Sequence, residues 1–88
     1  MKRFVQYQWD VRKDAENRRK HGLSLEDGIG ALEDPNAQSW VDNRSHGEWR
    51  FVTVGMMYPK LLVVVTAEPS EEVTRIISVR KAERHEKN

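Results

Sequence analysis

Three segments with strand character follow one another in the second half of the chain, and this arrangement constrains the fold more than any other feature. They are residues 49–56, 61–66 and 73–80. The segments between them, Met57–Lys60 and Glu68–Glu71, each contain a proline and have the length of hairpin turns. Short turns between consecutive strands predict an antiparallel meander. The continuously apolar run 61–66 predicts that its middle strand is covered on both faces.

The first half of the chain predicts a strand and then a helix. Residues 4–9 are rich in aromatic side chains and alternate loosely, which is typical of a short strand. A helix is predicted from Val11 to Lys20, with Asp10 as its N-cap and Gly22 just beyond its end. Its apolar face is thin, because it consists of Val11, Ala15 and little else.

A second helix is predicted to begin after Ser24, its N-cap, with Asp27 as an acidic capping-box residue. One apolar face of this helix is formed by Leu25, Ile29 and Leu32. Gly28 and Gly30 each cost up to ~1 kcal/mol in a helix interior. They therefore indicate either a shorter helix or close packing on the sheet. The helix is predicted to end at residues 34–36, which include Pro35.

A further weak strand at Gln38–Val41 completes the order β-α-α-β-β-β-β, which is followed by a short basic tail from Lys81 that favours a helical turn. We expect an α+β fold in which two N-terminal helices pack on one face of a mainly antiparallel sheet. The 88 residues are predicted to form a single domain, 1–88. The absence of cysteine and of a signal-peptide core or a long apolar run predicts a cytoplasmic protein without a membrane partner.

Charge is distributed unevenly along the chain, although the formal net charge is only +1. Residues 1–22 carry a net charge of +4 and residues 75–88 carry +3, whereas residues 23–48 carry −5. If the two basic ends meet in the fold, they form a positive surface that attracts a polyanion. The acidic middle is either a docking surface for a basic partner or a solvated surface.

The last predicted strand leads directly into two cations, Arg80 and Lys81. Strict alternation predicts one face made of Val73, Arg75, Ile77 and Val79 and another made of Thr74, Ile76, Ser78 and Arg80. Cations held on a rigid strand end are suited to binding a phosphate. The alternative is a basic C-terminus that only keeps the protein soluble.

Acid, base and cation chemistry is the only kind that the motifs support. Glu48 and Arg50 lie two residues apart on one strand face, close to His46. A carboxylate or imidazole there can take the proton of a ribose 2′-OH, and arginines can stabilise the charge on the phosphorane. The alternative is an inert, solvated ion pair. His21, His46 and His85 lack metal-ligand spacing, so no metal site and no cofactor are predicted.

Two residues near the first helix also have alternative interpretations. Trp9 is either a core residue that staples the helix or a platform on which a base stacks. His21 is either a helix-end residue that interacts with the dipole or a catalytic group.

Several spaced motifs together resemble one known family, the BrnT-type toxins. The residues that match its N-terminal signature are Trp9-Asp10, Lys13, Asn17, Lys20-His21-Gly22 and Ser24. The residues that match its strand motifs are Glu48-Trp49-Arg50-Phe51, Val54-Gly55, Leu61–Val65 and the run Arg75–Ala82. The match covers nearly the whole chain in the right order, with Lys81 where many relatives have a second arginine.

The resemblance implies a RelE-like fold and a toxin of a type II toxin–antitoxin pair. It implies a metal-independent endoribonuclease that arrests translation and growth and leaves a 2′,3′-cyclic phosphate. It also implies a ribbon-helix-helix antitoxin encoded next to it, with operator DNA bound only by the antitoxin complex.

The resemblance also implies roles for the site residues. Arg80 and Lys81 are expected to hold the scissile phosphate, and Glu48 is expected to act as base or to orient Arg50. We expect RNA to lie across a basic face built by the first helix and the end of the last strand, with Lys13, Lys20, His21 and Trp9 as substrate-binding residues. The alternatives are a non-catalytic RNA- or protein-binding module of the same fold and a structural subunit whose sheet edge recruits a partner strand.

Overall fold

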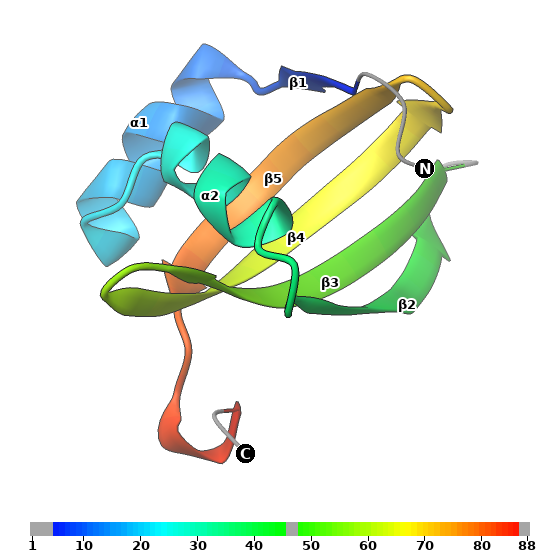
Figure 1. Cartoon of the computed structure of the whole chain (residues 1–88). Helices are drawn as coiled ribbons and strands as arrows, with labels where there is room; N and C mark the ends of the chain where they lie inside the picture. Colours follow the sequence, from blue (N-terminus) through cyan, green and yellow to red (C-terminus); the bar gives the residue numbers. More distant parts are fainter. Residues whose placement is uncertain (1–4, 46–47, 87–88) are drawn as a thin grey trace.

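The computed structural model describes residues 5–45 and 48–86 and has an α+β architecture with a five-stranded mixed sheet (Figure 1). The regular elements in chain order are β1 (Gln6–Gln8), α1 (Val11–His21), the 3₁₀ turn η1 (Leu25–Asp27), α2 (Gly28–Leu32), β2 (Gln38–Ser45), β3 (Glu48–Met57), β4 (Lys60–Ser70), β5 (Val73–Lys81) and the 3₁₀ turn η2 (Arg84–Glu86).

The sheet has the strand order β1-β5-β4-β3-β2. Strands β2 to β5 form the predicted antiparallel meander, and β4 lies at the centre of the sheet. The short strand β1 pairs with β5 in the parallel direction, from Gln6 opposite Val73 to Gln8 opposite Arg75. The chain therefore begins at the β5 edge and crosses to the β2 edge through α1, η1 and α2.

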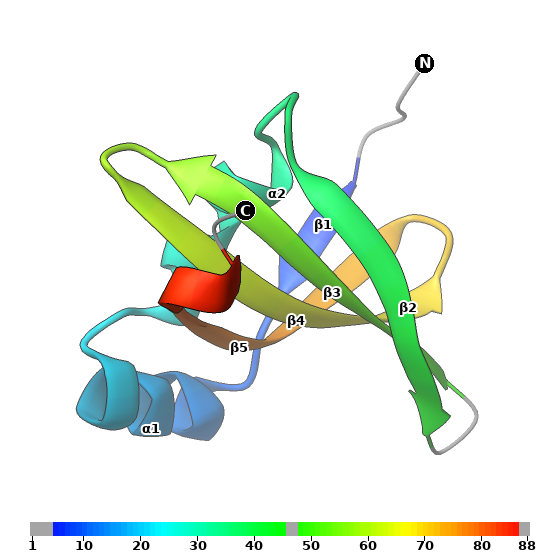
Figure 2. The same ribbon diagram turned by 90° about the horizontal axis from the view of Figure 1, so that it is seen from below.

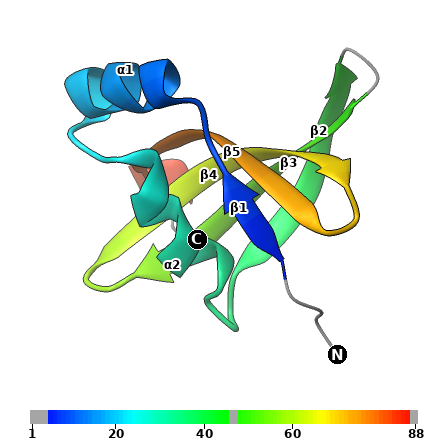
Figure 3. The ribbon, with the colours of Figure 1, turned by 90° about the horizontal axis from the view of Figure 1, so that it is seen from above.

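Helices α1 and α2 and the turn η1 form a layer on one face of the sheet, while η2 lies on the other side (Figures 1, 2 and 3). The core between the two layers is a cluster of seven buried side chains: Leu23, Leu25, Ala31, Leu62, Val64, Ile76 and Val79. The sheet face that points away from α2 is hereafter called the open face.

The local signals at the start of the helical layer are confirmed. Asp10 caps α1 by accepting hydrogen bonds from the N–H groups of Arg12 and Lys13, and Gly22 closes it with φ = 71°. Ser24 and Asp27 form the predicted capping box. The second predicted helix, in contrast, is divided into η1 and the five-residue α2.

Close backbone packing explains the glycines around α2. A side-chain carbon built on Gly28 would lie 2.9 Å from a methyl group of Val79. One built on Gly55, in β3, would overlap the carbonyl oxygen of Ala31. The predicted alternative of close packing on the sheet is therefore confirmed, and it fixes α2 directly over β3 and β4.

The predicted alternation of side chains along β5 is wrong. Ile76 and Val79 were assigned to opposite faces, but both are buried in the same core cluster. The β4–β5 register steps from Val65 opposite Ser78 to Thr66 opposite Ile76, so Ile77 is an extra residue, a β-bulge. A bulge reverses the alternation beyond it. It therefore places Arg75 and Arg80 on the same face of the sheet.

The β4–β5 turn is also displaced from its predicted position. It was expected at residues 68–71, but β4 continues to Ser70 and β5 begins at Val73. The register between these strands is irregular from Ala67 to Ser70. Pro69 lies within this interval, and proline has no N–H to contribute to a strand ladder.

Asp34 accepts a backbone hydrogen bond from the part of β3 that lies beyond its pairing with the first residue of β2. The first residue of β2, Gln38, pairs with Val54, so the N–H of Met56 lies past the strand and donates to the Asp34 carboxylate at 2.7 Å. The other carboxylate oxygen accepts the N–H of Asn36 at 3.0 Å. These hydrogen bonds, with that from Asn36 the larger cause, lower the pKa of Asp34 below its ordinary value.

We expect Asp34→Asn to lower the melting temperature at neutral pH, because an amide has one acceptor oxygen where the carboxylate uses two. A lowered pKa in the folded state means that the ionised carboxylate stabilises the fold above the unfolded pKa, roughly 3.9, and that this stability is lost as the pH falls. Melting curves of both proteins from neutral to acidic pH should therefore converge in acid. A difference that stays constant across this range would contradict this role.

Candidate nucleic-acid interface

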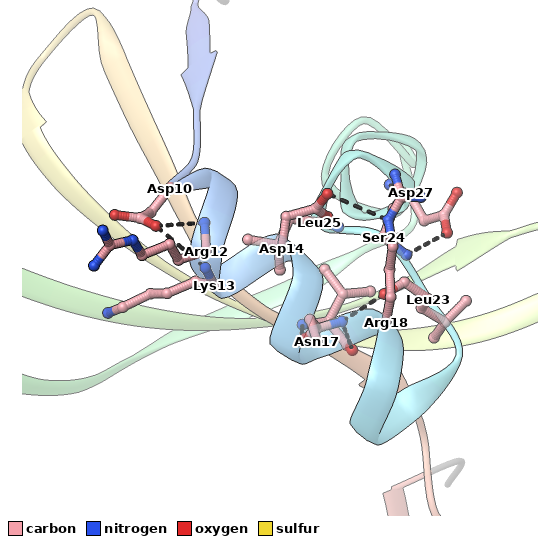
Figure 4. Close-up of polar contacts among 11 residues, drawn as sticks. Asp10, Arg12, Lys13, Asp14, Asn17, Arg18, Leu23, Ser24, Leu25 and Asp27 are labelled. Atoms are coloured by element: carbon pink, nitrogen blue, oxygen red, sulfur yellow. Dashed lines mark hydrogen bonds and ion pairs between the residues drawn. The ribbon is translucent and has the colours of Figure 1, made fainter.

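Asn17 joins α1 to the edge of β5. Its side-chain Nδ2 donates to the carbonyl oxygens of Leu23 and Val79, each at 2.8 Å, and its Oδ1 accepts the N–H of Val79 at 3.1 Å (Figure 4). Strand β1 pairs with β5 only as far as Arg75, so the backbone of Val79 lies on an edge that β1 does not reach. The Asn17 amide takes the place of a neighbouring strand there, and it is buried.

Polar contacts, rather than the thin predicted apolar face, hold α1 in place. Val11 is 79% exposed, whereas Asn17 is 6% exposed. Asp14 accepts the N–H of Leu25 at 2.8 Å and forms an ion pair with Arg18 at 3.2 Å (Figure 4). These contacts fix the rotation of the helix about its axis and therefore decide where its cations lie.

Lys13 and Lys20 lie on the side of α1 that faces away from η1. At 3.6 residues per turn, positions four before and three after Asn17 lie on one side of it, and Asp14 lies on the other. Since Asp14 contacts Leu25 in η1, the two lysines are turned toward the open face. Both are exposed.

Arg80 and Lys81 end β5 beside this part of α1. Arg80 pairs with Val63 and lies on the open face, and its guanidinium also donates to the carbonyl oxygen of Lys81 at 3.2 Å. Lys81 pairs with Leu62, so its side chain starts from the opposite face, but at the end of the strand it lines a cavity of about 390 Å³ with Met56 and Leu61, which lie on the open face. The bonds between Asn17 and Val79 join α1 to the end of β5, and the cations on either side of these two residues, Lys13, Lys20, Arg80 and Lys81, are hereafter called the α1–β5 seam.

A separate cluster of charges lies farther along the open face. Arg50, on β3, and Arg75, on β5, both pair with Ala67 of β4. Arg75 forms a hydrogen-bonded ion pair with Glu48. Sequence reasoning considered Arg50 as the residue that Glu48 orients, and it missed Arg75. Among the residues that the structure describes, the buried Nε of Arg50 has no hydrogen-bond partner.

The two clusters lie at different positions along β4. The Arg50–Ala67–Arg75 row and the Val63–Arg80 pair are four residues apart along β4, about 13 Å at ~3.3 Å per residue. Of the four residues predicted to be catalytic, Glu48 and Arg50 therefore lie apart from Arg80 and Lys81.

The remaining predicted residues have less direct connections to the seam. Trp9 packs against the core cluster, as in its structural interpretation. His21 is exposed at the end of α1. It lies two helical turns after Asp14 on the same side of the helix, and therefore on the side that faces η1. His46 lies outside the described residues.

The larger of the two cavities described here does not coincide with either cluster. It has a volume of about 570 Å³ on the helical side, where it is lined by Tyr7, Leu32 and Phe51, among others. The Tyr7 hydroxyl donates to Glu33 at 3.1 Å, and burial together with this carboxylate raises the pKa of Tyr7. We locate the candidate interface from the cations instead, because nucleic acid binds to open charged surfaces.

The described residues also include no helix that is both long and apolar enough to span a membrane. Within residues 5–45 and 48–86, no group of three histidine or acidic side chains is placed to hold a metal ion.

Comparison with known proteins finds a matching family and similar solved structures. The family described as "Ribonuclease toxin, BrnT, of type II toxin-antitoxin system" matches residues 9–86. The 1.1 Å crystal structure of the Brucella abortus ribonuclease toxin BrnT superposes with a TM-score of 0.74 at 23% sequence identity. The match covers 91% of this chain and 99% of that one. Among curated proteins, none matches this chain in sequence.

Proposed function

Because this chain belongs to the BrnT family of ribonuclease toxins of type II toxin–antitoxin systems, we propose that it is an endoribonuclease that binds RNA along the α1–β5 seam. The observation that supports this proposal is the bonding of Asn17, on the helix that carries Lys13 and Lys20, to Val79, the residue before Arg80. Cations fixed on a helix and a strand end bind a phosphodiester with little loss of side-chain freedom.

In this proposal Arg80 holds the scissile phosphate and Lys81 adds positive charge next to it. A guanidinium can donate to two phosphate oxygens and can stabilise the charge that grows on them in the transition state. The ribose 2′-OH is the internal nucleophile: its oxygen bonds to phosphorus as its proton passes to water, and the P–O5′ bond breaks as O5′ takes a proton from water. This step needs no metal and leaves a 2′,3′-cyclic phosphate and a 5′-hydroxyl. Growth and translation stop because RNA is cut in the cytoplasm.

We assign Glu48 an orienting role rather than that of the general base. Its carboxylate is paired with Arg75 and lies in the cluster that is separated from Arg80. In the cleavage assay below, Glu48→Gln is expected to retain the pH dependence of the wild-type rate. Loss of the acidic limb of the pH–rate profile would restore Glu48 as the base.

The type II family also implies an antitoxin. We propose that it is a ribbon-helix-helix protein encoded by the neighbouring gene, and that the complex binds operator DNA through this protein. Its acidic or apolar segments are expected to cover the seam cations. The chain should then be recovered together with the neighbouring gene product when one of them carries a tag.

The proposed function is tested with the purified chain and a single-stranded RNA in excess EDTA. We expect cleavage, a 2′,3′-cyclic phosphate detected by mass spectrometry, and growth arrest on expression that the neighbouring gene product relieves. RNA binding without cleavage would instead support the non-catalytic module. Neither binding nor cleavage, with an intact fold by circular dichroism, would remove RNA as the substrate.

A further inference from the structure

Three arginines from two strands share the open face, although strict alternation along β5 separates two of them. Strand β4 pairs without interruption with β3 from Ala67 to Lys60, so Val63, Val65 and Ala67 all point to one side of it. Residues directly opposite one another in a sheet share a face. The partners of these β4 residues are Val52 and Val54, together with the polar residues Arg50, Arg75, Ser78 and Arg80.

Arg50 and Arg75 flank a small, buried side chain on the open face, that of Ala67. Ala67 is 0% exposed although α2 lies on the other face, and its cross-strand neighbours on the open face are these two arginines. Long cationic side chains can cover an apolar neighbour with their stems and keep the charged groups at the surface. The side chain of Arg75 is 37% exposed.

The charges of this cluster favour an anion. Glu48 balances one of the two guanidinium groups, which leaves a net positive charge. The Nε of Arg50 is buried and has no hydrogen-bond partner among the described residues. A buried N–H donor without an acceptor is costly, and a bound acceptor in this cluster can remove that cost.

We propose that Arg50 and Arg75 form a second phosphate-binding site, which holds a phosphate of the same RNA strand at a distance from the one held by Arg80. This inference rests on the proposed ribonuclease function. The backbone rows of the two sites are about 13 Å apart at ~3.3 Å per residue, and we assign them to two different phosphates of one strand. Single-stranded RNA therefore runs along β5 on the open face, past Ser78, and Glu48 orients Arg75 for the distal phosphate.

The experiment compares two substrates of different length. A dinucleoside monophosphate carries only the scissile phosphate, whereas a 12-nucleotide single strand reaches both sites. Arg75→Gln is expected to lower cleavage of the long substrate by about tenfold. It should leave cleavage of the dinucleoside monophosphate unchanged. Equal losses on both substrates would overturn the proposal, because Arg75 would then act at the scissile phosphate or on the fold.

Binding of a 2′-O-methyl RNA, which cannot be cleaved, separates this inference from the catalytic proposal. Arg75→Gln should reduce the slope of log K against log[salt] by about 0.7, the value for one phosphate contact of a single strand. An unchanged slope would contradict the second site even if the wild type cleaves RNA. If the wild type does not cleave RNA, a smaller salt slope for Arg75→Gln still supports the second phosphate-binding site. In that case only the proposed ribonuclease activity is wrong.

Glu48→Gln and Arg19→Gln are the matched controls. If the Glu48–Arg75 ion pair only joins β3 to β5, then Glu48→Gln and Arg75→Gln should have the same effect on RNA affinity. The second site predicts opposite effects, because Glu48→Gln removes a negative charge and should tighten binding. Arg19 is exposed on the side of α1 away from Asn17, and Arg19→Gln loses the same unit of charge. It should change the salt slope less than Arg75→Gln.

Discussion

Replacement of Arg80 by alanine is expected to lower the rate of RNA cleavage by about 10²–10³-fold, the usual loss for one donor that stabilises transition-state charge. Arg80 lies at the end of β5, next to Val79, which Asn17 of α1 contacts, and its guanidinium binds the scissile phosphate in our proposal. Single-turnover cleavage measures the chemical step directly. The same variant should abolish growth arrest when expressed without the antitoxin.

Further variants at Arg80 and at Lys81 show whether the loss of cleavage is specific to the Arg80 guanidinium. Arg80→Lys should recover only part of the rate, because an ammonium is a point charge without the planar fork of donors. Lys81→Ala should cost less than Arg80→Ala, since Lys81 starts from the other face of the strand. The melting temperature of Arg80→Ala should remain near that of the wild type, as its side chain lies outside the buried core. Undiminished cleavage by a folded Arg80→Ala protein would remove the seam as the catalytic site.

The parts of the fold that depend on neighbouring residues were predictable from the sequence. Caps, turns and the meander are set by short-range spacing, and Asp10, Gly22 and Ser24 take their predicted roles. The parallel pairing of β1 with β5 was not predictable in this way. This pairing brings together Gln6 and Val73, which are far apart in the sequence, and it depends on the packing of the whole helical layer between them.

The candidate site was predicted less well, because two of its features are not local. The bulge at Ile77 leaves only a weak signal, namely adjacent apolar residues at 76 and 77 that fit either face. The partner of Glu48 is 27 residues away in sequence, so spacing within β3 pointed to Arg50 instead. A signal did exist for Asn17: a helix with almost no apolar face must be held by polar contacts.

Substitution of Asn17 is expected to have the largest effect on stability. Asn17→Ala leaves the N–H and C=O of Val79 and the carbonyl of Leu23 without their side-chain partner. Each buried group left unpaired costs about 1–3 kcal/mol, so with partial rehydration we expect a loss of about 2–4 kcal/mol. At about 4–8 °C per kcal/mol for a domain of this size, the melting temperature should fall by roughly 10–30 °C.

Asn17→Asp isolates the contribution of the Nδ2 donor, because the side chain keeps its shape. An ionised carboxylate in this buried position faces two carbonyl oxygens and cannot donate to either, so the folded state should raise the pKa of the new carboxyl group. A raised pKa means that the folded state binds the proton more tightly than the unfolded state, and the stability lost at neutral pH returns as the pH falls. The deficit of Asn17→Ala relative to the wild type should not change in this way.

These variants also test whether α1 must be held in place for RNA to bind. When Asn17 no longer bonds to Val79, Lys13 and Lys20 lose their fixed position beside Arg80. At a temperature where Asn17→Asp is still folded, its affinity for 2′-O-methyl RNA should fall at neutral pH. The affinity should recover in acid as a protonated carboxyl group again donates to a carbonyl oxygen. Affinity equal to the wild type at neutral pH, in a protein with the expected loss of stability, would show that the Asn17 bonds support the fold and do not organise the seam.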